Sequence, residues 1–353
     1  MNKKLLTAAI GAALVAGPML AAQAGPTVYG KINIGVASLN NGNTTDSKST
    51  VVTDDASRLG VKGNESLGRG LKAIYLIEMP VDADQGGFTT GATCSTTATV
   101  SCATTGRDVY AGLQGGWGTV RLGQFNTAYK NLSTGLEVLG DTIGDFTHST
   151  FQGETRTANT IAYTSPSFNG VSFGLESSRG ETGTTTEANP MVATVSYTGG
   201  PLYLGYGRVD LDVSGPTAGA STEYQKFVAS YKIGGVQLFT VLDDLNTETG
   251  SADSKTNHYG ASYTMGNNTF ALTYTKYDAK TVDTDATQTS VGWVHALSKS
   301  TALKTVYTKI DNEPSASRVG RIIGSTTSSS GALAATTAGN DPSGLQLQLS
   351  VSF

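Results

Sequence analysis

Charged residues are scarce in this sequence of 353 amino acids, at 15% against about 25% in ordinary soluble domains. Proline is also rare, with 9 residues, and after residue 24 no apolar run approaches the ~18 residues that a transmembrane helix needs. The leucine-, alanine-, glutamate- and lysine-rich blocks of helical bundles are missing. The chain is acidic, with a net charge of −4 at pH 7. These absences exclude a helical membrane protein and disfavour a helical bundle and a nucleic-acid-binding protein.

Cysteine and histidine are almost absent, which limits metal chemistry. The two cysteines, Cys94 and Cys102, are eight positions apart in a Gly/Thr/Ser segment with no histidine or acidic residue between them. In an exported protein this spacing predicts one disulfide that closes a surface loop, because a metal site would need more ligands nearby. P-loops, zinc-ligand spacings and EF-hand loops are also missing, so no cofactor and no metal ion is expected.

The first 24 residues have the pattern of a cleaved secretory signal peptide. Lys3 and Lys4 form a positive start, residues 5–20 form an interrupted apolar stretch, and residues 22–24 (AQA) give a small-x-small cleavage pattern. A short membrane anchor is the alternative, but the apolar stretch is broken and ends at the cleavage pattern. We expect a mature chain of residues 25–353, with 22 basic residues against 28 acidic ones and a net charge of −6.

From residue 25 onward the dominant hydrophobic period is two rather than 3.6. At the C-terminus, Leu345, Leu347 and Leu349 alternate with Gln346 and Gln348. Such alternation predicts extended strands with one wet face and one apolar face. In a soluble sandwich the apolar face meets another sheet, whereas in a membrane barrel it meets lipid.

The connections between the strands favour the barrel. Seven short Gly-rich turns alternate without a break with eight long polar loops, so fifteen connections join sixteen strands. The even count puts both termini at the end with the short turns, and pairing of the first and last strands leaves no edge exposed to lipid. The sequence therefore predicts an all-β, 16-stranded antiparallel transmembrane β-barrel, formed as one domain by residues 25–353.

Six pieces spread over the chain form a series that is more specific than any one of them. They are Thr27–Val36 (TVYGKINIGV), Ser57–Gly63 (SRLGVKG), Gly70–Glu78 (GLKAIYLIE), Val109–Gly123 (VYAGLQGGWGTVRLG), Thr160–Gly170 (TIAYTSPSFNG) and the terminal Phe353. In this order they resemble the general, trimeric porins of Gram-negative outer membranes, in the proteobacterial group with compact periplasmic turns. The resemblance implies a homotrimer of water-filled channels for passive diffusion of ions and small hydrophilic solutes.

The resemblance also implies partners and a constriction. The chain would contact outer-membrane lipid and lipopolysaccharide, and Phe353 resembles the C-terminal signal read by the barrel-assembly machinery during insertion. In such porins the third long loop, here about residues 126–155, folds into the barrel and narrows it, although this loop lacks the Pro-Glu-Phe-Gly-type segment of enterobacterial porins. Its acidic residues would then line the constriction: Glu137, Asp141, Asp145 and Glu154.

Strand parity predicts the opposite, basic wall. With Leu59 and Val61 facing lipid, Arg58 and Lys62 face the lumen, because a basic side chain at the lipid midplane costs about 2–4 kcal/mol. Arg107 shares the parity of an outward Val109, so it requires a bulge or a position above the lipid. A solvated surface charge is the alternative for each residue. The predicted basic wall is Arg58, Lys62, Lys72, Arg107, Arg121 and Arg156.

Three alternatives to a general porin stay open. A substrate-preferring anion channel would use the same inward basic residues. An outer-membrane barrel hydrolase would need His148, His258 or His295 in a Ser/His/acid set, which the spacing alone does not exclude. An adhesin would use the long outer loops for recognition. We expect a porin and no enzymatic activity.

Overall fold

The structure, a computed structural model, describes residues 25–42, 48–84, 86–87, 106–146, 155–179, 187–214, 221–248, 252–317 and 338–353. The predicted signal peptide, the predicted disulfide between Cys94 and Cys102, and Glu154 lie outside these residues. No helix among the described residues is long and apolar enough to cross a membrane.

The described chain is almost entirely β-structure, with one short helix, α2 (Ala128–Thr134), in the third long loop. The strands are β1 (Thr27–Asn40), β2 (Lys48–Asp54), β3 (Arg58–Gly68), β4 (Leu71–Pro80), β5 (Val109–Gly115), β6 (Gly118–Asn126), β7 (Arg156–Thr164), β8 (Val171–Ser178), β9 (Glu187–Gly199), β10 (Leu202–Ser214), β11 (Thr222–Ile233), β12 (Val236–Thr247), β13 (Ser254–Met265), β14 (Asn268–Ala279), β15 (Ala286–Ala296), β16 (Thr301–Asn312) and β17 (Ser343–Ser352).

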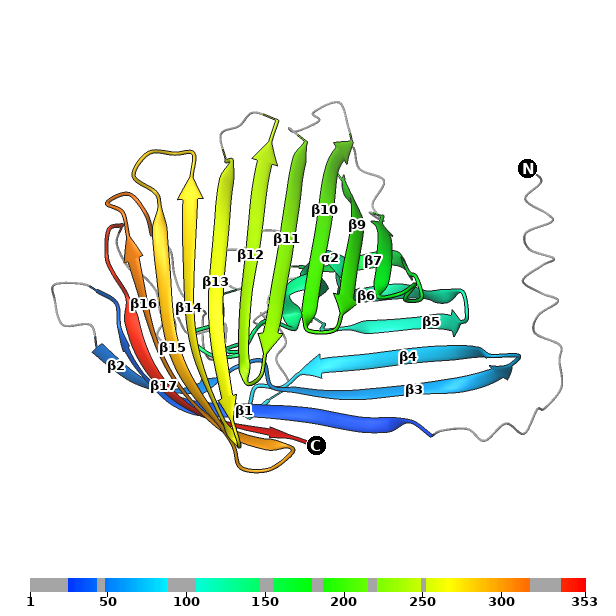
Figure 1. Ribbon diagram of the computed structural model, residues 1–353, viewed down its shortest axis with the longest axis horizontal. Coiled ribbons are helices and arrows are strands. Elements are labelled where there is room, and N and C mark those ends of the chain that lie inside the picture. The colour runs from blue at the N-terminus through cyan, green and yellow to red at the C-terminus, as the bar shows by residue number, and fades with distance from the viewer. Residues whose placement is uncertain are drawn as a thin grey trace, which may run out of the picture.

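These strands form a closed antiparallel barrel of sixteen strands, as predicted (Figure 1). β2 and β3 are two pieces of the second barrel strand, since both pair with β1, at Ile34↔Asp54 and Lys31↔Arg58 respectively. The last strand, β17, pairs with β1 and closes the sheet, so neither terminal strand leaves a free edge. A backbone bond from Phe353 N to Gly30 O, 3.1 Å long, ends this seam.

Side chains alternate across the wall as the period of two requires. In β17, Leu347 is 50% exposed on the outer face, whereas its neighbour Gln346 is 1% exposed on the inner face. Exposed leucine, valine and aromatic side chains continue around the outside of the barrel. A surface of this kind is stable in lipid, because the backbone polar groups are bonded between strands and the outward side chains are apolar.

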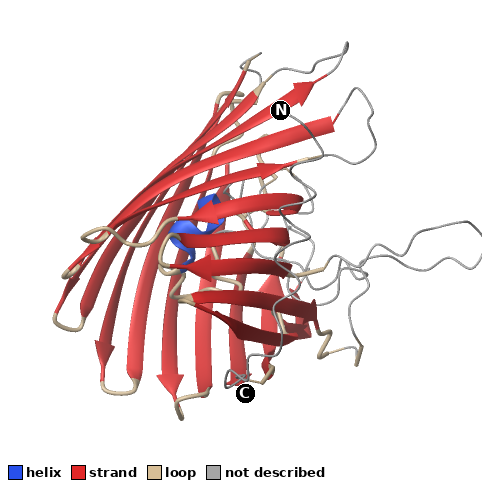
Figure 2. Ribbon diagram, turned by 90° about the vertical axis from the view of Figure 1, so that its right-hand side faces the viewer, coloured by secondary structure: helices blue, strands red, loops and turns tan. Residues whose placement is uncertain are grey.

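The core of the molecule lies between the third loop and the inner wall. Leu139 and Ile143 of the loop pack against Leu39, Val306 and Ile310 of the wall. The first half of the loop packs in the same way, with α2 lying inside the ring of strands in both ribbon views (Figures 1 and 2). Burial of these apolar side chains, at about 25 cal/mol per Å², holds the loop inside the barrel.

Candidate functional site

The third loop is anchored at its start by polar contacts to the wall. Thr127 caps α2 by accepting a hydrogen bond of 3.2 Å from Lys130 N, and Ala128 N donates to the Glu176 carboxylate at 2.9 Å. The Tyr129 hydroxyl donates to Asp243 at 2.5 Å, and Lys226 Nζ lies 4.0 Å from the same carboxylate. A helix of seven residues gains stability mainly from such tertiary contacts rather than from its own hydrogen bonds.

The second half of the loop is held by the opposite part of the wall. Ile143 N donates to the Gln346 side chain at 3.0 Å, and Lys304 Nζ donates to Gly140 O at 2.9 Å. Gln348 Nε2 donates to Asp141 O at 2.7 Å. The loop therefore crosses the lumen from β8–β12 to β16 and β17, with its backbone paired to side chains that alternation directs inward.

Asp141 is the loop acid that meets the basic wall. Its carboxylate lies 2.9 Å from Lys31 Nζ on β1 and 3.5 Å from Arg58 Nη1 on β3. Its main-chain N–H is bound at 3.2 Å by Asp145, whose side chain is buried within the loop. Asp141 and Arg58, both predicted for the constriction, are thus brought together.

Glu78 on β4 collects three further groups of the wall. It accepts hydrogen bonds from Arg107 and from the Tyr29 hydroxyl, the latter at 2.8 Å, and Arg58 Nε lies 3.7 Å away. Arg107 precedes the first residue of β5, Val109, and reaches the lumen from that position. Arg107 shares the odd parity of the outward-facing Val109. It can still point inward, because it lies before the strand, where side chains do not yet alternate between the two faces.

Arg156 forms a separate pair, with its Nε 2.7 Å from the Asp108 carboxylate. The register between β6 and β7 shifts between Gly123 and Phe125, so simple alternation does not carry from Ile161 to Arg156. A bulge of this kind re-aims the side chains on one side of it. Arg156 is the first residue of β7 and contacts Asp108, which precedes β5.

Two predicted basic residues lie over aromatic rings. Lys62 Nζ is 4.8 Å from the centre of the Tyr29 ring, and Arg121 Cζ is 4.4 Å from the centre of Phe125. Such cation–π contacts hold a basic side chain in place. Arg121 also interacts electrostatically with the Glu176 carboxylate. Lys72, near the end of the barrel with the short turns, pairs in register with Gln114 of β5.

A cavity of about 430 Å³ separates α2 from this wall. Tyr110, Gln114 and Arg121 line it from the wall, and Asn131 and Leu132 line it from the loop. The lining is mixed, with polar and charged groups next to apolar ones. Water and hydrated solutes are favoured in a space with such groups, and the loop narrows it from one side.

Several residues of this site were not predicted from the sequence. Lys31, Glu78 and Asp108 make ion pairs with predicted residues, but were not predicted themselves. A signal for Glu78 was present, since it shares the strand parity of Lys72. Glu137, which was also predicted, lies in the loop, where its carbonyl accepts from Gly140 N at 3.0 Å, and its place at the constriction stays a prediction.

The two histidines among the described residues belong to the wall strands β13 and β15. His258 is buried, stacks on Phe146 with ring centres 3.6 Å apart, and its Nδ1 lies 2.7 Å from the Thr275 hydroxyl. His295 Nδ1 lies 2.8 Å from the Asn268 side chain. His148, the third histidine, lies outside the described residues.

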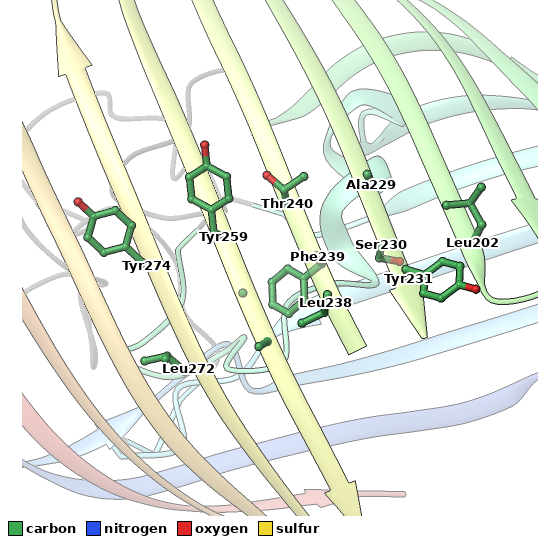
Figure 3. A pocket seen from close by; sticks show the side chains of 12 residues that line it. Leu202, Ala229, Ser230, Tyr231, Leu238, Phe239, Thr240, Tyr259, Leu272 and Tyr274 are labelled. Atoms are coloured by element: carbon green, nitrogen blue, oxygen red, sulfur yellow. The ribbon is translucent and has the colours of Figure 1, made fainter. Parts of the chain in front are cut away.

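A second depression, of about 530 Å³, belongs to the outer face of β10–β14 (Figure 3). Leu238, Tyr259, Leu272 and Tyr274 surround it, and all four are exposed outward-facing side chains. Its lining is apolar, in agreement with the lipid-facing band of a membrane barrel. This depression is therefore part of the lipid-facing surface, and the candidate functional site lies on the pore side of the wall.

A closed barrel with an apolar outside, a polar inside and a loop folded across its lumen defines a membrane channel. The chain belongs to the Gram-negative porin family, whose family model matches residues 6–315. It is 31% identical to outer membrane porin protein 32 of Delftia acidovorans over 324 residues, covering 86% of this chain and 88% of that one.

Solved structures agree in fold. An anion-selective porin from Comamonas acidovorans superposes with a TM-score of 0.76 at 24% identity, covering 93% of this chain and 99% of that chain. The trimer form of OmpT, an outer membrane protein of Vibrio cholerae, gives a TM-score of 0.61 at 14% identity, with 93% and 99% coverage. The chain is a porin of the Gram-negative outer membrane that forms a channel for passive diffusion.

Proposed function

We propose that solutes pass between the third loop and the wall of β3–β6, and that this passage favours anions. The observation that carries the proposal is the charge balance of the site. The wall and the neighbouring β1 present Lys31, Arg58, Lys62, Lys72, Arg107 and Arg121, whereas the carboxylates that interact with members of this set are Glu78, Asp141 and Glu176. Arg156 and Asp108 form a further, balanced pair.

The excess positive charge lies along the narrow passage, where the surrounding solvent screens it least. Low-dielectric walls focus the field of charged groups into a narrow aqueous passage, which raises the local concentration of ions of opposite sign. The opposed Asp141 keeps the field partly transverse, which favours hydrated polar solutes over apolar ones. The fold shared with a porin described as anion-selective supports the same proposal.

The proposal is tested by the zero-current potential across a planar bilayer under a potassium chloride gradient. The wild-type channel is expected to favour chloride. Arg58→Gln is expected to shift the potential toward potassium selectivity, because it removes a guanidinium next to the loop. A matched control is Arg208→Gln, an exposed arginine of β10 paired with Asp210 and Glu223, which should leave the potential unchanged. A potassium-selective wild-type channel would overturn the proposal.

We propose further that the chain assembles as a homotrimer, in contact with lipopolysaccharide, after insertion by the barrel-assembly machinery. The trimer form of a structural neighbour and the exposed apolar band of the barrel support the homotrimer.

The ring of Phe353 lies over Gly30, and its backbone pairs with the same residue, which makes the last residue part of the closing seam. Deletion of Phe353 should therefore lower the yield of inserted barrel in cells.

Residues 1–24 are proposed to be a signal peptide, and Cys94 and Cys102 to form a disulfide. The intact mass of the exported protein should correspond to a chain that starts at Gly25, and an alkylating probe should label neither cysteine in the unreduced, denatured protein. We also propose that the barrel has no catalytic role, in line with its family and relatives, which are channels.

A further inference from the structure

The cavity of about 430 Å³ between α2 and the inner wall has the composition of a binding site for a polar anion. Its size falls within the range of about 300–1,000 Å³ that is usual for small-molecule sites. Of the described residues that line it, Arg121 alone carries a charge. Serine and threonine side chains of β6–β9 make up much of the rest: Thr119, Thr164, Ser172, Thr194 and Ser196.

The polar side chains of the cavity form small groups near the short turns of the barrel. Gln114 Nε2 donates to Thr119 Oγ1 at 3.3 Å across the turn that joins β5 to β6. The hydroxyls of Ser172 and Ser196 lie 3.1 Å apart on β8 and β9. A hydroxyl group both donates and accepts hydrogen bonds. These side chains can therefore bond to the hydroxyl groups of a solute in either role.

Arg121 is held by aromatic rings. Its Cζ lies 4.4 Å from the centre of the Phe125 ring and 5.3 Å from the centre of the Tyr110 ring. Within the described chain no hydrogen bond or ion pair engages the guanidinium. A guanidinium packed on aromatic rings is fixed in position while its N–H groups stay available to a ligand. Since Arg121 also lines the cavity, that ligand would lie inside it.

Glu176 limits the charge that such a ligand can carry. Its carboxylate interacts electrostatically with Arg121 and accepts a hydrogen bond of 2.9 Å from Ala128 N at the start of α2. Glu176 does not itself line the cavity. A dianion would meet one guanidinium and the repulsion of this fixed carboxylate. A monoanion meets less repulsion, because the Coulomb energy is proportional to the charge.

We propose that this cavity binds a sugar acid, that is, a small monocarboxylate with several hydroxyl groups. The carboxylate pairs with Arg121, because a guanidinium offers two parallel N–H groups that match its two oxygens. The hydroxyl groups bond to the serine and threonine side chains of β6–β9. The inference rests on the proposed passage for the route by which the anion arrives. It makes the channel a general porin that retains one class of solute.

The test is block of the chloride current by sodium gluconate, a sugar acid, in planar bilayers that contain the refolded full-length mature protein. At a fixed potassium chloride concentration and pH 7.5, increasing gluconate should lower the current through the wild type. Acetate has the charge without the hydroxyls, and glucose has hydroxyls without the charge. Each should block at least ~10-fold less well, because each loses part of the hydrogen bonds. Inorganic phosphate, largely a dianion at this pH, should also block less well than gluconate.

Variants separate the charged contact from the hydroxyl contacts. Arg121→Gln should raise the half-blocking gluconate concentration at least ~10-fold, because it removes the hydrogen bonds to a charged group. Arg121→Lys should recover only part of the block, since an ammonium group lacks the planar fork. Ser172→Ala/Ser196→Ala should weaken the block by gluconate and leave that by acetate unchanged. The control Arg208→Gln, on the exposed face of β10, should be blocked like the wild type.

Folding of each variant is checked by its mobility on an unheated gel, and Ser172→Ala/Ser196→Ala decides the outcome if Arg121→Gln does not fold. The proposal is overturned if acetate, glucose or phosphate blocks the wild type as well as gluconate does. It is also overturned if folded Arg121→Gln, or in its place Ser172→Ala/Ser196→Ala, is blocked like the wild type. In a chloride-selective channel these results leave the proposed function intact. A potassium-selective wild type that gluconate still blocks through Arg121 would overturn the proposed function alone.

Discussion

Asp141 and Glu78 are the two carboxylates around which the basic side chains of the wall gather. Asp141 holds Lys31 and Arg58 from the loop side, and Glu78 holds Arg58 and Arg107 from the wall side. Arg58 lies between them and links the two groups. These side chains form a chain of ion pairs with more cations than anions.

Replacing the loop carboxylate should increase anion preference. Asp141→Asn removes one negative charge from the passage and leaves Lys31 and Arg58 without their shared partner. We expect the zero-current potential under a salt gradient to move further toward chloride. Asp311→Asn, at the far end of β16 and beside Lys309, is a control of equal charge change that should leave it unmoved. A shift toward potassium in Asp141→Asn would contradict the charge assignment.

Replacing the wall carboxylate should lower stability. In Glu78→Gln the guanidinium of Arg107 and the Tyr29 hydroxyl keep their positions but lose a charged acceptor. Removal of one partner from a largely buried hydrogen-bonded group costs about 1–3 kcal/mol. We expect the folded band on gels to be lost at a lower temperature or urea concentration than in the wild type. Unchanged stability would show that Glu78 is solvated rather than paired.

Among the structural elements, the third loop is the one that narrows the lumen of the barrel. Its packing relies on places where the wall has no side chain. A Cβ atom added at Gly292 would lie 2.3 Å from Leu139 Cδ2, and one at Gly207 would lie 2.8 Å from Leu132 Cδ1. The loop can approach the wall so closely only because glycine occupies these positions.

Gly292→Ala is therefore expected to push the loop into the passage and reduce single-channel conductance. The second change, Leu139→Ala, removes the atoms that the new methyl group meets, so the double variant should recover part of the lost conductance. The two substituted positions are in direct contact, so their effects on conductance should be non-additive. Equal conductance of the wild type and folded Gly292→Ala would show that the loop does not limit the current.

The start of the second loop should respond to pH through Asp84. Its pKa is raised to about 6 from 3.8, so its protonated form is favoured in the folded state. That contribution to stability is complete below about pH 4 and is lost as the pH rises through about 6. The heat stability of the folded band on gels should therefore fall less between pH 5 and pH 7.5 in Asp84→Asn than in the wild type. An equal fall in the two proteins would contradict this assignment.

At the scale of the whole molecule, the fold was predictable because strand alternation and loop lengths repeat over the entire chain. The pattern of Leu345–Ser350 alone shows which face meets lipid, and sixteen such segments determine a closed barrel. The site was predictable only in part. Arg58 and Arg121 follow from parity, but the meeting of Asp141 with Lys31, 110 positions away, depends on how the loop crosses the lumen. The break at residues 55–57 and the helix α2 have no comparable signal in the period of two.

Assembly is also a property of the whole molecule. A homotrimer predicts a band of high apparent mass on unheated gels that converts to the monomer band on heating. Chemical cross-linking in outer-membrane vesicles should trap species up to three chains and none larger. A folded protein that migrates and cross-links only as a monomer would contradict the proposed trimer while leaving the channel within one chain intact.

The proposed anion-favouring channel is tested most directly by single-channel recording of the refolded wild-type protein in a planar bilayer. An open, water-filled passage predicts stepwise currents in groups of three, a conductance that rises in proportion to salt concentration, and a zero-current potential on the anion side under a potassium chloride gradient. Correctly folded protein that gives no conductance, or a conductance that favours potassium, would contradict the account of a passage bounded by Asp141 and the basic wall.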